Sequence, residues 1–143
     1  TSWSWAAKFA DLDNDGWLDL FVANGHVYPQ ADQAATNTTY RQKNQLFHNL
    51  RNGTFADVSM SLGPGLEVLH SSRGTAIADY DQDGDIDVFI INEGALPTLL
   101  RNEGVENHAL RVRLQGSRGN RAGIGAPLTL HTHAGNPVRG MRP

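Results

Sequence analysis

The hydrophobic positions of this chain fall in short runs that alternate with polar, glycine-rich segments. Apolar residues dominate residues 6–10, 18–23, 75–78 and 86–91, and a turn rich in Asp and Gly follows the first and the third of these runs. Runs of four to eight residues bounded by turn residues predict strands, so each pair of runs predicts a strand–turn–strand hairpin. The 15 glycines are spread along the chain, which favours frequent tight turns.

The two hairpins are copies of one unit. Residues 9–21 recur as residues 77–89, with Asp, Gly and apolar residues at matching positions. In the first copy, residues 45–48 and 54–58 predict two more strands around a turn that contains Asn52-Gly53. Four strands is the size of a propeller blade, and such repeats bury their apolar faces by stacking on neighbours. The sequence therefore predicts an all-β fold of β-propeller-type blades, and two blades predict a larger parent protein.

The rest of the chain predicts an insertion and a further module. Residues 25–43 are polar and without clear period, as in a surface insertion. Residues 109–114 alternate apolar and basic side chains and, with residues 124–131, predict a second strand pair. Residues 1–100 hold 13 acids and 5 bases, whereas residues 101–143 hold 2 acids and 7 arginines. This change predicts a boundary near residue 100, after repeat units at about 1–68 and from 69 to beyond 100.

The Asp-rich turns are the strongest candidates for chemistry. The pattern Asp-x-Asp-x-Asp-Gly-x-x-Asp occurs twice. Calcium prefers six to eight oxygen ligands, which carboxylates at alternate loop positions supply, and without a cation these carboxylates would repel one another. Main-chain carbonyls at the seventh loop position are natural further ligands. The sequence predicts two Ca²⁺ sites, formed by Asp11, Asp13, Asp15, Trp17 and Asp19, and by Asp79, Asp81, Asp83, Asp85 and Asp87.

Three other interpretations of these loops are less favoured. An EF-hand needs a bidentate Glu at position twelve and flanking helices, but Val22 and Ile90 stand there, within apolar strand-like runs. Magnesium suits one or two carboxylates with water better than a cage of four. Asp and Gly also gather in ordinary turns, yet the duplication in matched context argues against chance.

No constellation outside the loops predicts catalysis. His131 and His133 could pair on a strand face, but no third ligand lies nearby, and His26, His48, His70 and His108 are interpreted as surface or packing residues. The arginines at 111, 113, 118 and 121 lack the aromatic neighbours on which nucleic-acid bases would stack. There is no nucleophile with a base, no acid pair outside the loops, and no apolar run of the roughly 18 residues that a membrane span needs.

The chain resembles the FG-GAP/VCBS-repeat family, whose blades are similar to those of integrin α propellers, and within it the cartilage acidic protein (ASPIC/UnbV) group. The residues that carry the resemblance are the two Asp loops, residues 22–29, 44–49, 53–58 and 74–79, and, for the ASPIC/UnbV module, residues 99–104, 107–114 and 120–126. The resemblance implies two blades in residues 1–100, followed in residues 101–143 by the start of a truncated ASPIC/UnbV-like β module. It also implies a secreted or cell-surface protein, in a bacterial periplasm or outside the cell.

These observations predict a calcium-binding, non-catalytic structural, adhesion or protein-interaction module. The alternatives are a calcium-dependent carbohydrate-binding module, or part of an enzyme built on the same propeller. The expected partner is a protein of the extracellular matrix or cell surface, not nucleic acid, and unpaired blade edges favour self-association.

Overall fold

The computed structural model describes residues 2–33, 37–104, 107–117, 119–131 and 137–139, which form two compact units, Thr1–Ala109 and Leu110–Pro143. The predicted all-β class is confirmed, since the strands of this described part are joined by turns, irregular segments and three short 3₁₀ helices. The strands are β1 (Ser4–Ala10), β2 (Asp19–Asn24), β3 (Gln45–Asn49), β4 (Phe55–Asp57), β5 (Ser72–Ala78), β6 (Asp87–Asn92), β7 (Thr98–Leu100), β8 (Thr129–His131) and β9 (Pro137–Arg139). The 3₁₀ helices are η1 (Pro29–Asp32), η2 (Ser59–Ser61) and η3 (Pro64–Leu66).

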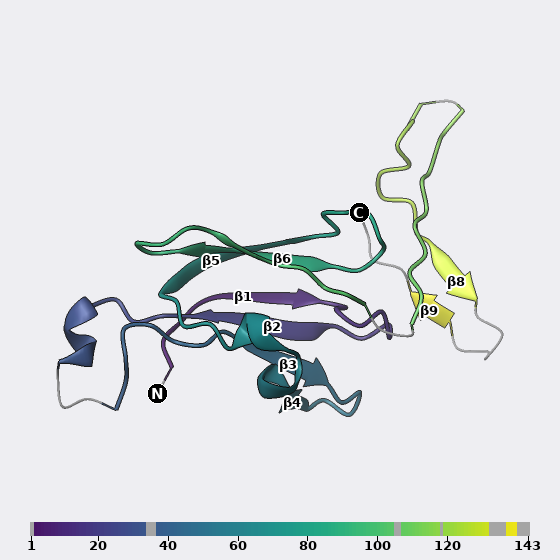
Figure 1. The fold of residues 1–143 in the computed structure, drawn as a ribbon. Coiled ribbons are helices and arrows are strands. Elements are labelled where there is room, and N and C mark those ends of the chain that lie inside the picture. Colours follow the sequence, from purple (N-terminus) through teal and green to yellow (C-terminus); the bar gives the residue numbers. More distant parts are fainter. Residues whose placement is uncertain (1, 34–36, 105–106, 118, 132–136, 140–143) are drawn as a thin grey trace. The chain divides into compact units, whose positions relative to one another are not determined.

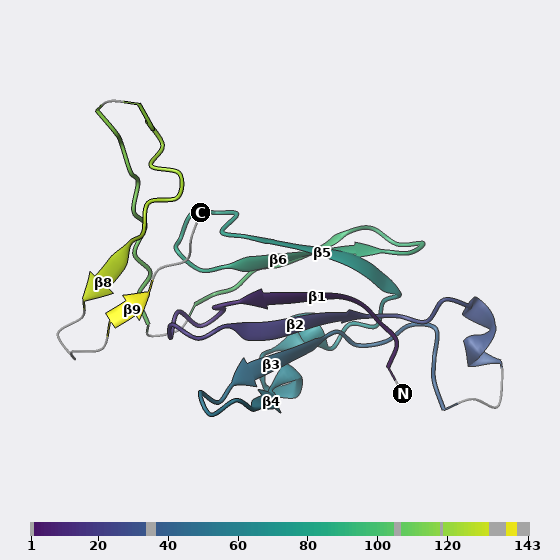
Figure 2. The same ribbon diagram turned by 180° about the vertical axis from the view of Figure 1, so that it is seen from behind.

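The first unit consists of two antiparallel sheets, which lie one over the other in Figures 1 and 2. The first has the order β1-β2-β3-β4, and the second has the order β5-β6-β7. The hairpins β1–β2 and β5–β6 share one register, in which Ala10 pairs with Asp19 and Ala78 with Asp87. Both also have an irregularity at the start of the first strand. The sequence repeat is therefore a structural repeat.

A hydrogen bond between a serine and a buried asparagine closes the far end of each hairpin. The Ser4 hydroxyl donates to the Asn24 side-chain oxygen (2.8 Å), and the Ser72 hydroxyl donates to Asn92 in the same way (3.0 Å). The amides of both asparagines donate onward, Asn24 to the Lys43 carbonyl and Asn92 to the Leu96 carbonyl. Because buried polar groups need partners, these bonds define where each strand ends.

The core lies between the two sheets. Strands β1 and β2 pack on β5, and the buried cluster joins alternate residues of β2 with alternate residues of β6. Its members are Ala10, Leu12, Phe21, Ala23, Leu66, Val88 and Ile90. Each sheet thus buries one face against the other.

Gly25, directly after β2, lies against the backbone at the start of β5. A Cβ atom at this position would lie 2.6 Å from the Ser71 Cα and 2.7 Å from the Ser72 nitrogen. Because backbone atoms cannot move aside as a side chain can, glycine is required here. The chain then enters residues 25–44, which include η1 and connect β2 to β3.

The prediction of four strands per repeat is confirmed for the first repeat and wrong for the second over the residues that the structure describes. In the first repeat, positive φ angles at Arg51 and Gly53 turn the chain back from β3 into β4. In the second, the chain leaves β7 at residue 100 and crosses to the first Asp loop, where Asn107 donates to the Asp13 carbonyl. None of the described residues after β7 forms a return strand along it.

The second unit differs from its prediction. Residues 109–114 form no strand, because alternation alone does not supply a hydrogen-bonding partner, and Leu110 and Val112 are exposed. Of residues 124–131, only β8 is a strand, and its partner is β9. His133 lies outside the described residues. None of the described helices is long and apolar enough to cross a membrane.

Asp57, at the end of β4, gives one expected pH effect. Its carboxylate accepts hydrogen bonds from the hydroxyl and amide of Ser59 and from the Gln45 amide, and the Ser59 hydroxyl contributes most to holding the pKa of Asp57 below its usual value. A carboxylate with a lowered folded-state pKa adds stability above its unfolded pKa and loses it as pH falls through the folded pKa. We expect Asp57→Asn to lower Tm by on the order of 2 °C at pH 7, and this difference to shrink as pH falls below the ordinary aspartate pKa of about 3.9 and through the lowered pKa of the folded state. Melts across pH check this, and a difference that stays constant with pH would contradict it.

Candidate metal centre

The two Asp loops have the same backbone conformation. The fourth loop position has a positive φ angle in both copies, 55° at Asn14 and 65° at Gln82, and so does the sixth, 88° at Gly16 and 103° at Gly84. At the next position the backbone N–H donates to the aspartate two residues before it, from Trp17 to Asp15 (2.7 Å) and from Asp85 to Asp83 (3.0 Å). The repeated residues therefore fold into a repeated loop.

The last aspartate of each loop is buried and ties the loop to the sheet. Asp19 accepts hydrogen bonds from the amides of Leu12 (3.3 Å) and Asn49 (2.9 Å). Asp87 accepts from the amides of Tyr80 (2.8 Å) and Asn102 (2.9 Å). Each carboxylate thus joins the start of its own loop to the end of the third strand of its sheet.

Asn49 and Asn102 are equivalent residues that the sequence analysis did not connect. Their side-chain amides donate to equivalent carbonyls, those of Leu18 and Ile86. The pairing of Leu20 with Phe47 likewise corresponds to that of Val88 with Leu100. Residues 99–102 therefore form the third strand of the second repeat and its end, and the recurrence of residues 46–49 as residues 99–102 was the signal for it.

The aspartates of the first loop are close to one another and partly buried. Asp11 accepts hydrogen bonds from the amides of Asp15 (2.9 Å) and Gly16 (2.9 Å), which close the turn. Burial raises the pKa of Asp11 despite these two bonds. Burial also raises the pKa of Asp13, and the charges of Asp15 and Asp19 raise it further. The loop therefore holds its carboxylates at an electrostatic cost that a bound cation would relieve.

Basic side chains that sequence reasoning missed stand beside the loops. His48 Nδ1 lies 3.1 Å from Asp19 and 3.4 Å from Asp13, contacts that its interpretation as a surface or packing residue did not predict. Arg51 pairs with Asp15 at 2.6 Å, and Arg101 pairs with Asp81 at 2.7 Å. His48 and Arg101 occupy equivalent positions next to Asn49 and Asn102, and the same recurrence in the sequence could have identified them.

Only some of the predicted ligands have ligand atoms close enough to one another to hold a single ion. Within the described part of the chain, two groups of acidic or histidine side chains have ligand atoms within 4.8 Å of one another, Asp13-Asp15-His48 and Asp79-Asp81-Asp87. The second group offers only oxygen, which fits a hard cation such as Ca²⁺. The first includes an imidazole, a donor typical of transition metals. Asp11, Asp19 and Asp83 belong to neither group, and for Trp17 and Asp85 the predicted ligand is the main-chain carbonyl.

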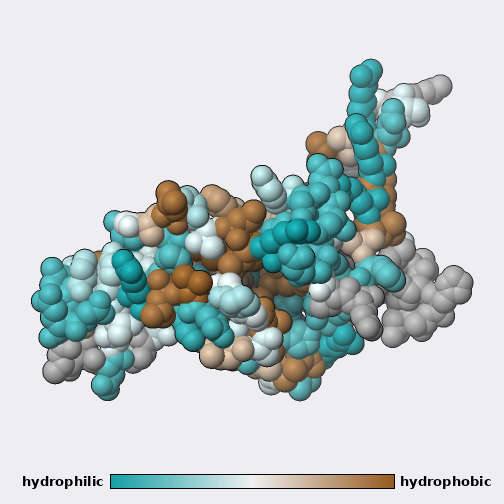
Figure 3. Space-filling view, viewed as in Figure 1, coloured by the Kyte–Doolittle hydropathy of each residue, from teal (hydrophilic) through white to brown (hydrophobic). Residues whose placement is uncertain are grey.

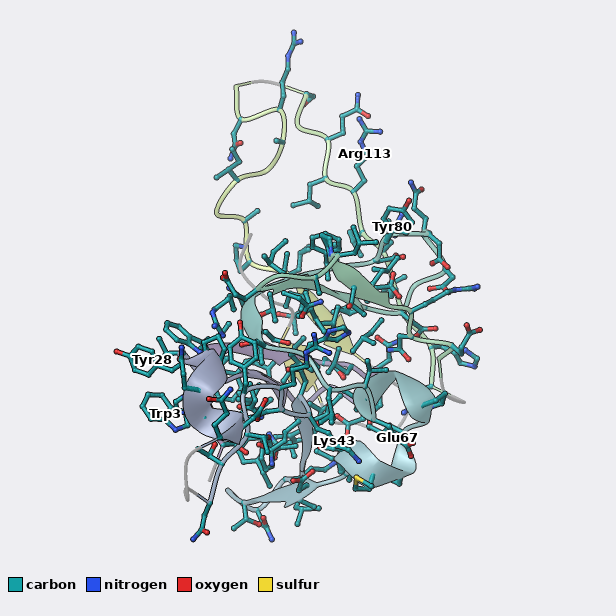
Figure 4. The ribbon with its side chains drawn as sticks, turned by 60° about the vertical axis from the view of Figure 1, so that its left-hand side comes forward. Trp3, Tyr28, Lys43, Glu67, Tyr80 and Arg113 are labelled. Carbon is teal, nitrogen blue, oxygen red and sulfur yellow. The ribbon has the colours of Figure 1, made fainter. Side chains whose placement is uncertain are left out.

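Hydrogen bonds link the two loops, which lie at the same end of the unit in Figures 1 and 2. The Asn14 side chain of the first loop donates to the Asp85 carboxylate (2.7 Å) and the Gly84 carbonyl (3.4 Å) of the second. Asn102 donates to the Leu12 carbonyl (2.7 Å). The ring of Tyr80 stands at the surface beside this loop pair (Figure 4). The two loops are therefore in direct contact, and a structural change in one loop would act directly on the other.

Comparison with known proteins agrees with this geometry. Residues 30–90, from η1 to the middle of β6, match the family of FG-GAP-like repeats. This segment of the chain is therefore similar to an FG-GAP-like repeat. This result confirms the resemblance drawn from the residues, and the family's propeller-type blades agree with the two antiparallel sheets of the first unit.

The chain is also similar to cartilage acidic protein 1 of Mus musculus. The two are 47% identical over 45 residues, which cover 32% of this chain and 7% of that protein. The chain thus spans less than a tenth of the relative that it matches. No solved structure matches it.

Proposed function

We propose that this chain is a calcium-stabilised, non-catalytic structural or protein-interaction module of a secreted or cell-surface protein. The observation that carries the proposal is the second loop, where three aspartates offer oxygen ligand atoms within 4.8 Å of one another. The repetition of the same backbone turn in the first loop supports it. FG-GAP-like repeats are typical of extracellular adhesion and interaction modules, and calcium is abundant outside cells, so the family and the donor chemistry support one another.

The residues that would hold calcium are those of the two loops. In the second they are Asp79, Asp81, Asp83 and Asp87 with the carbonyl of Asp85, and in the first Asp11, Asp13, Asp15 and Asp19 with the carbonyl of Trp17. A bound cation supplies positive charge that removes the repulsion between the carboxylates. The loop amides keep the carboxylates in place, and Asp19 and Asp87 transmit the order of each loop to the third strand of its sheet.

Calcium binding to the folded chain predicts a metal-dependent thermal stability. Ligand that binds only the folded state adds about 2.7 kcal/mol per site at a free concentration of 100 Kd. We expect excess calcium to raise Tm well above its value in chelator, magnesium to raise it less, and calorimetric titration to count about two sites. Equal effects of the two metals, or no effect of either, would contradict calcium-specific stabilisation.

Asp81→Asn separates binding from folding. Asp81 lies in the three-aspartate group, but its carboxylate is partly exposed and forms an ion pair with the exposed Arg101 side chain, so its loss costs little in chelator. We expect the variant to keep the Tm of the parent in chelator and to lose about one site's share of the rise in calcium. Glu67→Gln is the matched control, because it removes one negative charge at the end of η3, away from Tyr80 of the second loop (Figure 4). If Glu67→Gln loses as much of the calcium effect as Asp81→Asn, the effect is one of net charge rather than of a site.

A further inference from the structure

Asparagine followed by glycine occurs twice in this chain, as Asn24-Gly25 at the end of β2 and as Asn52-Gly53 in the turn between β3 and β4. In such a pair the backbone nitrogen of the glycine can attack the side-chain amide of the asparagine, and glycine hinders this attack least because it has no Cβ atom. The attack requires a free backbone nitrogen and an asparagine side chain that water can reach. The structure gives the two pairs opposite environments in both respects.

Asn24-Gly25 is closed to this reaction. Asn24 is 0% exposed, and its Nδ2 group donates to the Lys43 carbonyl (3.0 Å) and to the Gln45 side chain (3.0 Å). The Gly25 N–H donates to the Trp3 carbonyl (2.9 Å). Both nitrogen atoms that would react are therefore held in hydrogen bonds and kept from water.

Asn52-Gly53 is open. Asn52 is exposed, and among the hydrogen bonds of the described residues none involves its Nδ2 group or the Gly53 N–H. A Cβ atom added to Gly53 would have no neighbouring atom within 4 Å, so the glycine stands in open space. The turn lies at the lower edge of the first unit in Figure 1, and this edge is part of the molecular surface in Figure 3. Water therefore reaches the reacting groups.

Thr54 adds a feature that promotes the attack. Its hydroxyl donates to the Asn52 Oδ1 atom (2.6 Å), and its backbone N–H donates to the same oxygen (3.0 Å). When a nitrogen attacks the amide carbon, negative charge develops on this oxygen, and hydrogen-bond donors that are already in place stabilise that charge. The turn thus holds two donors where the reaction needs them.

We propose that Asn52 is a site of spontaneous deamidation, promoted by the hydroxyl of Thr54. The Gly53 nitrogen gives its proton to a base in solution and forms a bond to the Asn52 Cγ atom. The bond from Cγ to Nδ2 then breaks, and Nδ2 takes up a proton and leaves as ammonia. Water opens the resulting cyclic imide at either carbonyl, which produces aspartate or isoaspartate. Water is the one co-reactant, and nothing is oxidised or reduced.

The product changes the surface next to the first Asp loop. Arg51, the residue before Asn52, pairs with Asp15 of that loop at 2.6 Å. Deamidation adds a negative charge one residue from this arginine, and isoaspartate also adds one carbon atom to the main chain of the turn. The inference goes beyond the proposed function, and it does not depend on calcium binding.

Peptide mapping by mass spectrometry tests the proposal on the full chain during incubation in mildly alkaline buffer. The chain is made in a host that does not glycosylate asparagine, because Asn52-Gly53-Thr54 is also an acceptor sequence for N-glycosylation. We expect aspartate and isoaspartate to accumulate at position 52 while Asn24 stays intact in the folded chain. In urea, where the fold no longer protects it, Asn24 should react as well.

Two variants at position 54 separate the effect of the turn from that of the dipeptide. Thr54→Val removes the hydroxyl and keeps the branched shape of the side chain. It should slow deamidation of the folded chain by about threefold to tenfold, the effect of one neutral hydrogen bond on a barrier. Thr54→Ser keeps the hydroxyl and should react at the rate of the parent. In urea all three chains should react alike, because the turn is absent there.

Each outcome decides the proposal. If Asn52 stays as intact as Asn24 in the folded chain, or reacts only in urea, the turn protects the dipeptide and the proposal is overturned. Equal rates for the folded parent and Thr54→Val would overturn it too, since the hydroxyl would then contribute nothing. Thermal melts of both variants show that the chains compared are folded, and failure of calcium binding in the same samples leaves the result unaffected.

Discussion

Phe21→Ala is expected to lower the free energy of unfolding by about 3–5 kcal/mol, the usual cost of removing a buried phenylalanine from a packed core. Phe21 is 1% exposed and lies between the two sheets, in contact with the cluster that includes Val88 and Ile90. Its removal leaves a cavity that neither sheet can close, because Gly25 already holds the two sheets at backbone contact. Urea denaturation in excess calcium, followed by tryptophan fluorescence, measures the change.

Phe89→Ala is the matched control for this variant. Phe89 has the same place in the repeat, but 41% of its surface is exposed. Its truncation should cost about 1 kcal/mol, because less apolar area leaves water on folding and no closed cavity forms. Both variants are measured at low protein concentration, where association of the chain does not contribute to the free energy of unfolding. Equal losses for the two variants would mean that the outer side of the β5–β6–β7 sheet, on which Phe89 lies, is covered in solution.

This pair also shows what the sequence could not predict. Residues 9–21 and 77–89 repeat so closely that the hairpins, their strands and the loop turns could be read directly, and the structure has them. An alternating strand pattern, however, does not say which of two apolar faces meets a partner. That depends on which neighbouring sheet is present, so Phe21 and Phe89 have the same local sequence and opposite environments.

The third strand of the second repeat was obscured by a difference in connection length. Residues 25–44 join β2 to β3, whereas residues 93–97 suffice to join β6 to β7. The number of residues that separates equivalent positions of the two repeats therefore changes between the second and the third strand. A sequence comparison at one fixed separation finds no match beyond β6. For this reason Arg101 and Asn102 were grouped with the C-terminal segment, although they correspond to His48 and Asn49.

The prediction of ligands by spacing treated four aspartates of each loop as alike, and the structure separates them by environment. Asp81 and Asp83 are partly exposed and reach the flexible Arg101 side chain. Asp19 and Asp87 are each 2% exposed and accept backbone amides that no other group satisfies in the hydrogen bonds described. Position in a motif does not reveal this difference, because it arises from the third strand, which lies outside the motif.

Asp87→Asn is accordingly expected to destabilise the chain with or without calcium, by about 3 kcal/mol. Asp87 accepts the amide of Tyr80 on one oxygen and the amide of Asn102 on the other. The asparagine amide group can replace only one of these acceptors, and its N–H₂ group would face a backbone donor in a buried place. Loss of a hydrogen bond to a charged group costs about 1.5–3 kcal/mol, and a buried unsatisfied donor adds to that cost.

Denaturation of Asp87→Asn and Asp81→Asn in chelator and in calcium distinguishes the two roles. Asp81→Asn should match the parent in chelator and fall behind only in calcium, whereas Asp87→Asn should be less stable in both. The variant Asp19→Asn repeats the test in the first loop, where the amides of Leu12 and Asn49 take the places of those of Tyr80 and Asn102. If Asp87→Asn kept the parent's stability in chelator, the two amides would be satisfied without the carboxylate. Asp87 would then act only as a ligand of the kind that its loop spacing predicts.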